Sequence, residues 1–197
     1  MHTLLLCSAN KGKLREMRAL LPANYSIRGL LDTGHVGTLQ ETGTTLEQNA
    51  LQKATYGHRI TGLISVADDS GLEVHALGGA PGIHSADYSG SRSDQANIQR
   101  LLHEMLGKRD RKARFRTVIA VVHGELQHTF TGHCDGVIAD HAIGTDGFGY
   151  DPIFIPEGYG HTFAEMNLAE KNKISHRMKA MNAFIRWLEL EFPSFPA

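Results

Sequence analysis

The sequence has few cysteines, almost no net charge and no long apolar stretch at its start. Its two cysteines, Cys7 and Cys134, are far apart and form no C-x-x-C pair, which argues against a disulfide framework or a thiolate zinc site. The apolar run at residues 3–7 is too short for a signal-peptide core or a membrane span. We therefore expect a cytoplasmic protein without a membrane segment.

The balance of charge argues against a nucleic-acid partner. With 20 Lys and Arg against 21 Asp and Glu, the formal net charge is -1, whereas duplex-binding domains are strongly basic. An aromatic content of 7% gives little support to single-strand binding, and the 12 histidines include no H-E-x-x-H motif for a metal. A chain of 197 residues that is 41% hydrophobic is typical of one globular domain, which we expect to span residues 1–197.

Apolar strand patterns alternate with helical patterns along the chain. We expect strands at residues 3–7, 63–67, 115–122 and 126–134. Helices are expected after the turn at residues 8–12, from Thr44 or Thr45, and from Ser93 or Asp94. An apolar stripe predicts a C-terminal helix through Ile174, Met178, Met181, Ile185 and Leu188. The alternation indicates an α/β fold, and the hairpin at residues 115–134 indicates a mixed sheet.

Two adjacent acids follow the apolar run at residues 63–67. Asp68 and Asp69 would repel each other, and burying either is costly unless a cation or a hydrogen bond meets it. In a cleft, Mg²⁺ is the cation that such carboxylates favour, and a free carboxylate beside it could serve as a general base. The alternative is a turn at the end of the strand, capped locally by Asp69 or Ser70.

A short polar loop at residues 8–13 precedes the first helix. Free backbone N–H groups at a helix start favour an anion, and Lys13 adds a full charge, so Ser8, Asn10 and Lys13 suggest a phosphate site. The loop is not a Walker A motif, because Cys7 stands where the first glycine is required. A capped helix start with a solvated lysine explains the same residues.

Thr45, Asn49 and Lys53 are spaced four apart and share one face of the second helix, with Glu41 just before it. A polar stripe of this kind is often only a solvated face, and it gains significance if it faces Asp68 and Asp69.

Two segments near the C-terminus combine aromatic or basic residues with turns. In residues 144–154 a glycine-bounded Phe148 or Tyr150 could present its ring to a nucleobase, with Asp151 as an acceptor; a turn with core aromatics is the alternative. Ser175 is a plausible helix cap, which puts His176 and Arg177 in a first turn where cations are unfavourable unless an external anion binds. The alternative for the second segment is a solvated basic turn.

Together these motifs resemble one family in their order and spacing. The matching segments are Ser8-x-Asn10-x-x-Lys13, Glu41-x-x-x-Thr45-x-x-x-Asn49-Ala50, residues 67–72, Gly79-x-Pro81-Gly82, residues 147–152 and residues 175–177. The chain resembles the inosine/xanthosine triphosphate pyrophosphatases in their bacterial form, over nearly its whole length.

The resemblance implies an elongated mixed sheet flanked by helices, with two lobes around a nucleotide cleft, in a homodimer. It also implies Mg²⁺-dependent hydrolysis of ITP, dITP or XTP to the monophosphate and pyrophosphate, which removes deaminated purines from the nucleotide pool. Two alternatives are a nucleotide-binding sensor without hydrolysis and a pyrophosphatase for other modified nucleotides.

The same resemblance implies roles for individual residues. Asp69 would be the general base and a metal ligand, with Glu41 as the second ligand, whereas Asp68 receives no role. The phosphates would be held by Lys53 and by the loop residues Ser8, Ala9, Asn10, Lys11, Gly12 and Lys13. The nucleotide site would be lined by Ser70, Phe148, Gly149, Tyr150, Asp151, Lys171, His176 and Arg177.

Overall fold

The computed structural model describes residues 2–8, 11–35 and 39–192. Its internal contacts divide the chain into two compact units. The first unit comprises Met1–Asp69, Val118–Thr131 and Ala180–Ala197, and the second comprises Ser70–Thr117 and Gly132–Lys179. Both units are discontinuous in sequence, and the expectation of a single domain over residues 1–197 stays a prediction.

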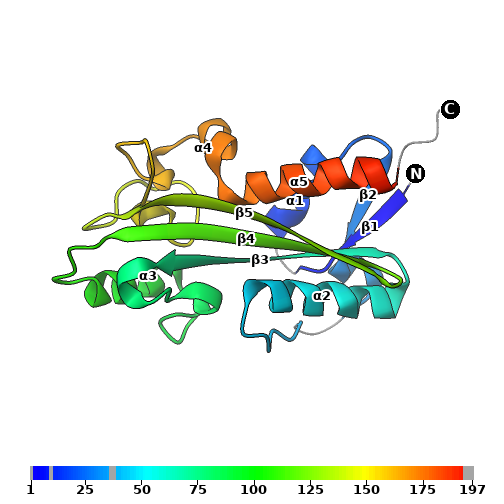
Figure 1. Ribbon diagram of the computed structural model, residues 1–197, viewed down its shortest axis with the longest axis horizontal. Coiled ribbons are helices and arrows are strands. Elements are labelled where there is room, and N and C mark those ends of the chain that lie inside the picture. Colours follow the sequence, from blue (N-terminus) through cyan, green and yellow to red (C-terminus); the bar gives the residue numbers. More distant parts are fainter. Residues whose placement is uncertain (1, 9–10, 36–38, 193–197) are drawn as a thin grey trace. The chain divides into compact units, whose positions relative to one another are not determined.

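The strands form one six-stranded sheet in the order β2-β1-β3-β4-β5-β6. Strand β1 pairs in parallel with β2 and β3 (Figure 1). Strand β5 pairs antiparallel with β6, which confirms the predicted mixed sheet. The bounds are β1 His2–Leu6, β2 Tyr25–Gly29, β3 Ile64–Val74, β4 Lys112–His123, β5 Leu126–Ile138 and β6 Phe154–Pro156. The short strands β2 and β6 were not predicted from the sequence.

The helices begin at the caps that the sequence offers. Thr45 accepts a hydrogen bond from the backbone N–H of Gln48, and Ser93 accepts one from that of Ala96, so Thr45 rather than Thr44 is the cap. The α-helices are α1 Lys11–Leu20, α2 Leu46–Thr61, α3 Asp94–Glu104, α4 Leu168–Ile174 and α5 His176–Glu191. Short 3₁₀ helices occupy Leu30–Thr33, His75–Leu77, Gly82–His84, Asp151–Ile153 and Phe163–Glu165. Within the described part of the chain, no helix combines the length and the apolar character required to cross a bilayer.

In the first unit, helices cover both faces of the sheet. Met17 of α1 and Phe184 of α5 pack with Leu4 and Val66 in one core, and α2 lies on the opposite face (Figure 1). Burying a large apolar side chain contributes roughly 1.5–3 kcal/mol, so this core fixes both helices on the sheet. Helix α2 comes close to β1 at Gly57, where an added Cβ would lie 2.1 Å from Cys7 Sγ.

The expected end of β3 at Ala67 is wrong, because the strand continues through both acids to Val74. Acidic residues are rare inside strands, which is why the sequence suggested a turn there. Successive side chains of a strand point to opposite faces. Ile64 and Val66 belong to the core that contains α1, whereas Ser65 lies close to Gly57 of α2. This alternation reaches Asp68 and Asp69.

The second unit has its own core, which includes Leu72, Leu101, Phe154 and Phe163. Ile174 packs against this core from α4, so its predicted place in the C-terminal helix is wrong. Ser175 has extended backbone angles (φ -64°, ψ 146°) and separates α4 from α5, a break that the uninterrupted apolar spacing concealed.

Candidate active site

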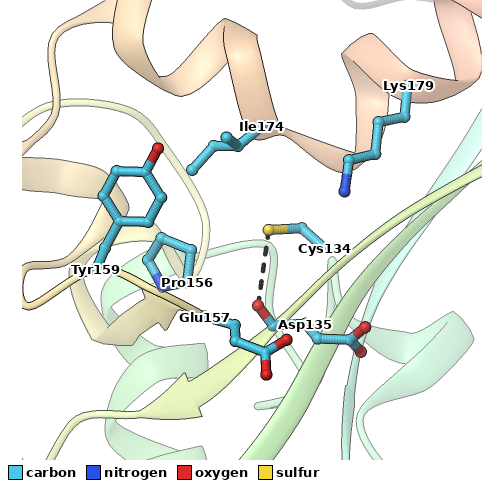
Figure 2. Close-up of a pocket in the computed structure, with 7 residues that line it drawn as sticks. All are labelled: Cys134, Asp135, Pro156, Glu157, Tyr159, Ile174 and Lys179. Atoms are coloured by element: carbon cyan, nitrogen blue, oxygen red, sulfur yellow. Dashed lines mark hydrogen bonds between the residues drawn. The ribbon is translucent and has the colours of Figure 1, made fainter.

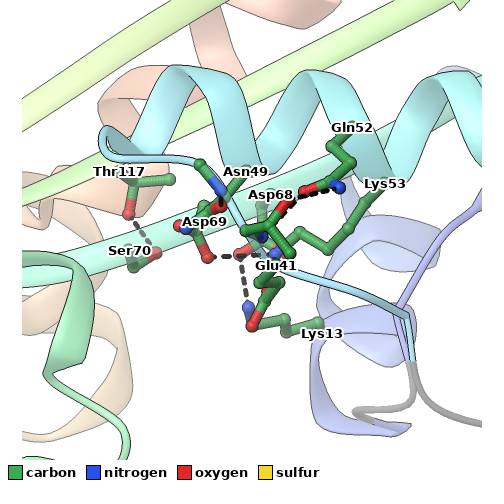
Figure 3. Close-up of polar contacts among 11 residues, drawn as sticks. Lys13, Glu41, Asn49, Gln52, Lys53, Asp68, Asp69, Ser70 and Thr117 are labelled. Atoms are coloured by element: carbon green, nitrogen blue, oxygen red, sulfur yellow. Dashed lines mark hydrogen bonds and ion pairs between the residues drawn. The ribbon is translucent and has the colours of Figure 1, made fainter.

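Asp68 and Asp69 each pair with a different lysine of the first unit (Figure 3). Lys13 Nζ, from α1, lies 2.7 Å from Asp68 Oδ2, and Lys53 Nζ, from α2, lies 2.9 Å from Asp69 Oδ1. Because β3 turns the two carboxylates to opposite faces, each meets the helix that covers its own face. Adjacent acids are therefore tolerated, since neither carboxylate is left in the protein interior without a cation.

Glu41 and Asp69 converge on the same ammonium group. Lys53 Nζ donates hydrogen bonds to Glu41 Oε1 and to Asp69 Oδ1, and the lysine side chain is buried. Burial disfavours the charge of Lys53, but the carboxylates outweigh it, so the pKa of Lys53 lies above its usual value. Burial also raises the pKa of Asp69, and Lys53 offsets only part of that effect. The two carboxylates thus place negative charge on either side of the Lys53 ammonium group.

The polar stripe of α2 faces these acids, as its predicted functional role requires. Lys53 contacts Asp69 directly, and a hydrogen bond with Asn49 also favours the ionised form of Asp69. Thr45 acts as the helix cap. The segment that carries Glu41 is tied to the same helix, because Asn49 Oδ1 accepts a hydrogen bond of 2.8 Å from the Gly43 N–H.

Gln52 adds a second tie that the sequence did not reveal. Its Oε1 accepts from the Thr42 N–H at 3.0 Å, and its Nε2 donates to Thr42 Oγ1 at 3.0 Å. These bonds fix the residue next to Glu41, so α2 positions both predicted metal ligands.

The predicted phosphate loop is described in part. Helix α1 begins at Lys11, which places the backbone of Lys11, Gly12 and Lys13 in a first turn that has no acidic residue. Backbone N–H groups of a first helical turn lack partners within the helix and attract anions. Ser8 lies among the described residues after β1, whereas Ala9 and Asn10 lie outside them.

In the second unit, Asp151 organises the glycine-rich segment. The Asp151 side chain is buried, and its Oδ2 accepts hydrogen bonds from the Phe148 N–H at 2.9 Å and from Lys171 Nζ at 2.5 Å. Gly147 has a φ of +81°, and an added Cβ there would lie 2.1 Å from Asp151 Oδ2, so glycine is required. Asp151 is therefore an internal support of this segment as well as a candidate ligand contact.

Phe148 is the ring that this segment exposes. Its exposed fraction is 54%, and both Lys171 Nζ and Arg177 Cζ lie 5.2 Å from the ring centroid. Tyr150, in contrast, is buried and donates its hydroxyl to the Ser85 carbonyl at 3.0 Å. Of the two aromatic residues that we considered for stacking on a base, the geometry favours Phe148.

Asp94 supports the same segment from α3. Its Oδ2 accepts a hydrogen bond of 2.7 Å from the Gly149 N–H. Nothing in the sequence relates these two positions, because the contact depends on the folding of a distant loop against a helix start.

His176 starts α5 beside the aromatic core of the second unit. Its imidazole stacks on Phe115 with a centroid distance of 4.7 Å and an interplanar angle of 9°. Ser175 Oγ accepts from the Met178 N–H at 3.3 Å, which confirms the predicted cap. Ser70 Oγ lies 2.7 Å from Thr117 Oγ1, a contact that the sequence did not indicate.

A separate pocket of about 160 Å³ in the second unit contains none of the predicted site residues (Figure 2). Cys134 lines it, and its Sγ donates a weak hydrogen bond of 3.8 Å to the Asp135 carbonyl. Burial raises the pKa of the Cys134 thiol, so the pocket offers a poorly ionised cysteine rather than a reactive one. The lining residues are Cys134, Asp135, Pro156, Glu157, Tyr159, Ile174 and Lys179.

The donor set of the first unit suits a hard divalent cation. Over the described residues, no three His, Cys, Asp or Glu side chains gather as a complete metal cage. Glu41 and Asp69 nevertheless bring two carboxylates to the ammonium group of Lys53. The position of this ammonium group shows that positive charge is favourable between the two acids. Two carboxylates are the protein contribution typical of Mg²⁺ that also binds substrate phosphates.

Comparison with known proteins identifies close relatives over nearly the full length. Residues 4–187 match the Ham1 family. A dITP/XTP pyrophosphatase from Christiangramia forsetii is 45% identical over 186 residues, covering 94% of this chain and 98% of the relative. The dITP/XTP pyrophosphatase from Bacillus subtilis is 42% identical over 194 residues, covering 96% of this chain and 98% of the relative.

Solved structures agree with this relationship. The Ham1 protein of Staphylococcus aureus has a TM-score of 0.91 at 38% identity, covering 96% of this chain and 99% of that one. A HAM1 protein from Coxiella burnetii has a TM-score of 0.92 at 36% identity, covering 96% and 100%.

Proposed function

The chain belongs to the Ham1 family, and from this premise we propose that it hydrolyses ITP, dITP and XTP to the nucleoside monophosphate and pyrophosphate. The names and high coverage of its relatives support the enzyme class and the deaminated purine substrates. The observation that carries the proposal is the convergence of Glu41 and Asp69 on the buried ammonium group of Lys53. A protein that only binds nucleotides does not require this pair of carboxylates.

We assign Glu41 and Asp69 as the residues that hold Mg²⁺. When bound there, the ion would supply positive charge that offsets the charge of the triphosphate. Lys53, which contacts both carboxylates, would keep them in place and add a further positive charge.

In the reaction, Asp69 accepts a proton from the attacking water. The water oxygen bonds to the α-phosphorus, the bond between that phosphorus and the bridging oxygen to the β-phosphate breaks, and pyrophosphate leaves. Without Mg²⁺, burial holds the pKa of Asp69 above its usual value, whereas Lys53 and Asn49 favour the ionised carboxylate that can accept the proton.

The remaining predicted residues divide into two groups. The loop residues Ser8 to Lys13 hold the phosphates, and Ser70, Phe148, Gly149, Tyr150, Asp151, Lys171, His176 and Arg177 form the nucleoside site. Donors directed at a 6-keto oxygen are left unpaired by a 6-amino base, and such mismatches discriminate strongly. This chemistry favours hypoxanthine and xanthine over adenine. The family resemblance further supports a homodimer and a cytoplasmic location.

Product analysis tests the proposal. The purified protein is incubated with Mg²⁺ and ITP, XTP, GTP or ATP in parallel, and nucleotides, pyrophosphate and phosphate are measured separately. We expect monophosphate and pyrophosphate from ITP and XTP, with ATP and GTP largely intact. Diphosphate and phosphate would contradict the bond that we assign.

Additional binding measurements and a wider set of metals and nucleotides separate the alternatives. ITP binding without turnover in every metal tested would favour a sensor. Turnover confined to modified pyrimidine or methylated nucleotides in an extended panel would favour a related pyrophosphatase.

A further inference from the structure

The two adjacent acids of β3 form ion pairs with different lysines. Asp69 points to the α2 side, where Lys53 and Glu41 are found, whereas Asp68 lies 2.7 Å from Lys13 of α1. A strand places neighbouring side chains on opposite faces, so Asp68 and Asp69 meet different helices. The charge of Asp68 also raises the pKa of Lys53, but less than that of Asp69 does, and Asp68 pairs directly with Lys13.

The pair of Asp68 and Lys13 is unequally buried. The Asp68 side chain has an exposed fraction of 5%, whereas that of Lys13 is 21%. A buried carboxylate is costly without a cation, so Asp68 holds the ammonium firmly, while the lysine side remains accessible to solvent. The arrangement suits a fixed acid that directs a lysine toward an incoming ligand.

We propose that Asp68 is a positioning residue that holds Lys13 at the start of α1 for a substrate phosphate, and that it is not a ligand of the metal. The inference rests on the proposed function, in which Lys13 contacts the triphosphate. A lysine side chain loses rotamer entropy when a ligand immobilises it, and an ion pair formed before binding removes part of that cost from substrate binding. An ammonium group has three donors, so a bond to Asp68 is compatible with a further bond to phosphate.

Steady-state kinetics with ITP test the inference. Asp68→Asn should raise KM about tenfold with kcat changed by less than about threefold, because a charge-assisted contact that orients a binding group is lost. Lys13→Ala should raise KM to a similar degree. The double variant should be no worse than Lys13→Ala alone, because Asp68 acts through Lys13.

A second readout avoids turnover and metal altogether. In EDTA, the affinity for ITP measured by calorimetry should fall about tenfold in Asp68→Asn. Asp135→Asn is the matched control, because it removes the carboxylate of an exposed ion pair with Arg114 and should leave both readouts unchanged. Asp68→Glu keeps the charge but displaces it, and should give an intermediate KM if Asp68→Asn fails to fold.

Three results would overturn the inference. One is unchanged ITP affinity in EDTA together with a higher Mg²⁺ requirement, which would make Asp68 a metal ligand. Another is a lower Tm with normal KM, which would make the ion pair structural only. A third is additive effects of the two substitutions. If the wild type neither binds nor hydrolyses ITP, the proposed function fails instead, so the two failures are distinct.

Discussion

The hydroxyl oxygens of Ser70 and Thr117 lie 2.7 Å apart, and Thr117 has no exposed surface. Burying a hydroxyl group costs free energy unless the group forms a hydrogen bond. Here that bond fixes the rotamer of a predicted nucleoside contact.

Thr117→Val should therefore weaken substrate binding without unfolding the protein. Valine preserves the shape but removes the hydrogen bond, so we expect KM for ITP to rise about threefold to tenfold. Thr117→Ser retains the hydroxyl and should restore KM to near the wild-type value. Equal KM values for the wild type and Thr117→Val would show that Ser70 needs no such support.

Asp69→Asn tests the general base. The amide is nearly isosteric and cannot accept the proton, so turnover should fall by about a hundredfold or more while ITP binding in EDTA is retained. Single-turnover assays and calorimetry provide the two measurements. Near-normal turnover would remove Asp69 from the mechanism.

Lys13→Ala tests whether Lys13 acts on the phosphates or on the base. Because every substrate carries the same triphosphate, KM should rise by the same factor for ITP and for XTP. Parallel kinetics with the two nucleotides give the ratio. A loss that depends on the base would contradict a phosphate role.

The close approach of α2 to β1 predicts the effect of a methyl group. Gly57→Ala places Cβ 2.1 Å from Cys7 Sγ and 3.0 Å from Leu5 Cδ2, which should destabilise the protein by about 1–3 kcal/mol. The steric cost should exceed the gain of roughly 1 kcal/mol from helix propensity. Urea unfolding measures the difference.

Cys7→Ala provides the matched background for this substitution. Removing the sulfur should make Gly57→Ala less damaging than it is in the wild type. A cost independent of residue 7 would place the clash elsewhere.

The two cysteines should differ in reactivity. Burial raises the pKa of Cys7 to about 12. Burial also raises the pKa of Cys134, but this residue lines a pocket of about 160 Å³. Only the thiolate reacts, so at about pH 8 iodoacetamide should modify Cys134 slowly and leave Cys7 intact in the native protein. Peptide mass spectrometry checks this, and both residues should react in urea. Faster labelling of Cys7 would contradict the burial.

The same shift has a consequence for stability. The unfolded thiol of Cys7 ionises near its ordinary pKa of 9.0, below the folded pKa of about 12. Its contribution to stability is therefore complete below pH 9.0 and is lost as the pH rises toward about 12. Cys7→Ser should lose less stability than the wild type over this window.

Local signals in the sequence predicted much of the fold. Thr45, Ser93 and Ser175 act as the helix caps that were expected, and the hairpin turns at Gly124, whose φ is +58°. These features depend on neighbouring residues only. The course of β3 was missed because Asp68 and Asp69 disfavour a strand locally, and distant lysines compensate them only after folding.

The site was predicted at the level of residue type more than of contact. The resemblance placed Glu41 and Asp69 together, and Lys53 joins them in the structure. The contact of Thr117 with Ser70 was not predicted, because the two residues are 47 positions apart and a threonine in an apolar strand gives no local sign of its partner. The support that Asp94 gives to Gly149 was not predicted either, because this hydrogen bond forms only when a distant loop folds against the start of α3.

The alternation of β3 also limits how this segment can change in length. Deleting or inserting a single residue between Ile64 and Asp68 would exchange the faces of both acids, so that each would meet the wrong helix. A change of two residues would preserve the faces and shift only the position along the strand. Natural variation in this stretch should therefore favour substitutions over single-residue insertions or deletions, and any change of length here should be by an even number of residues.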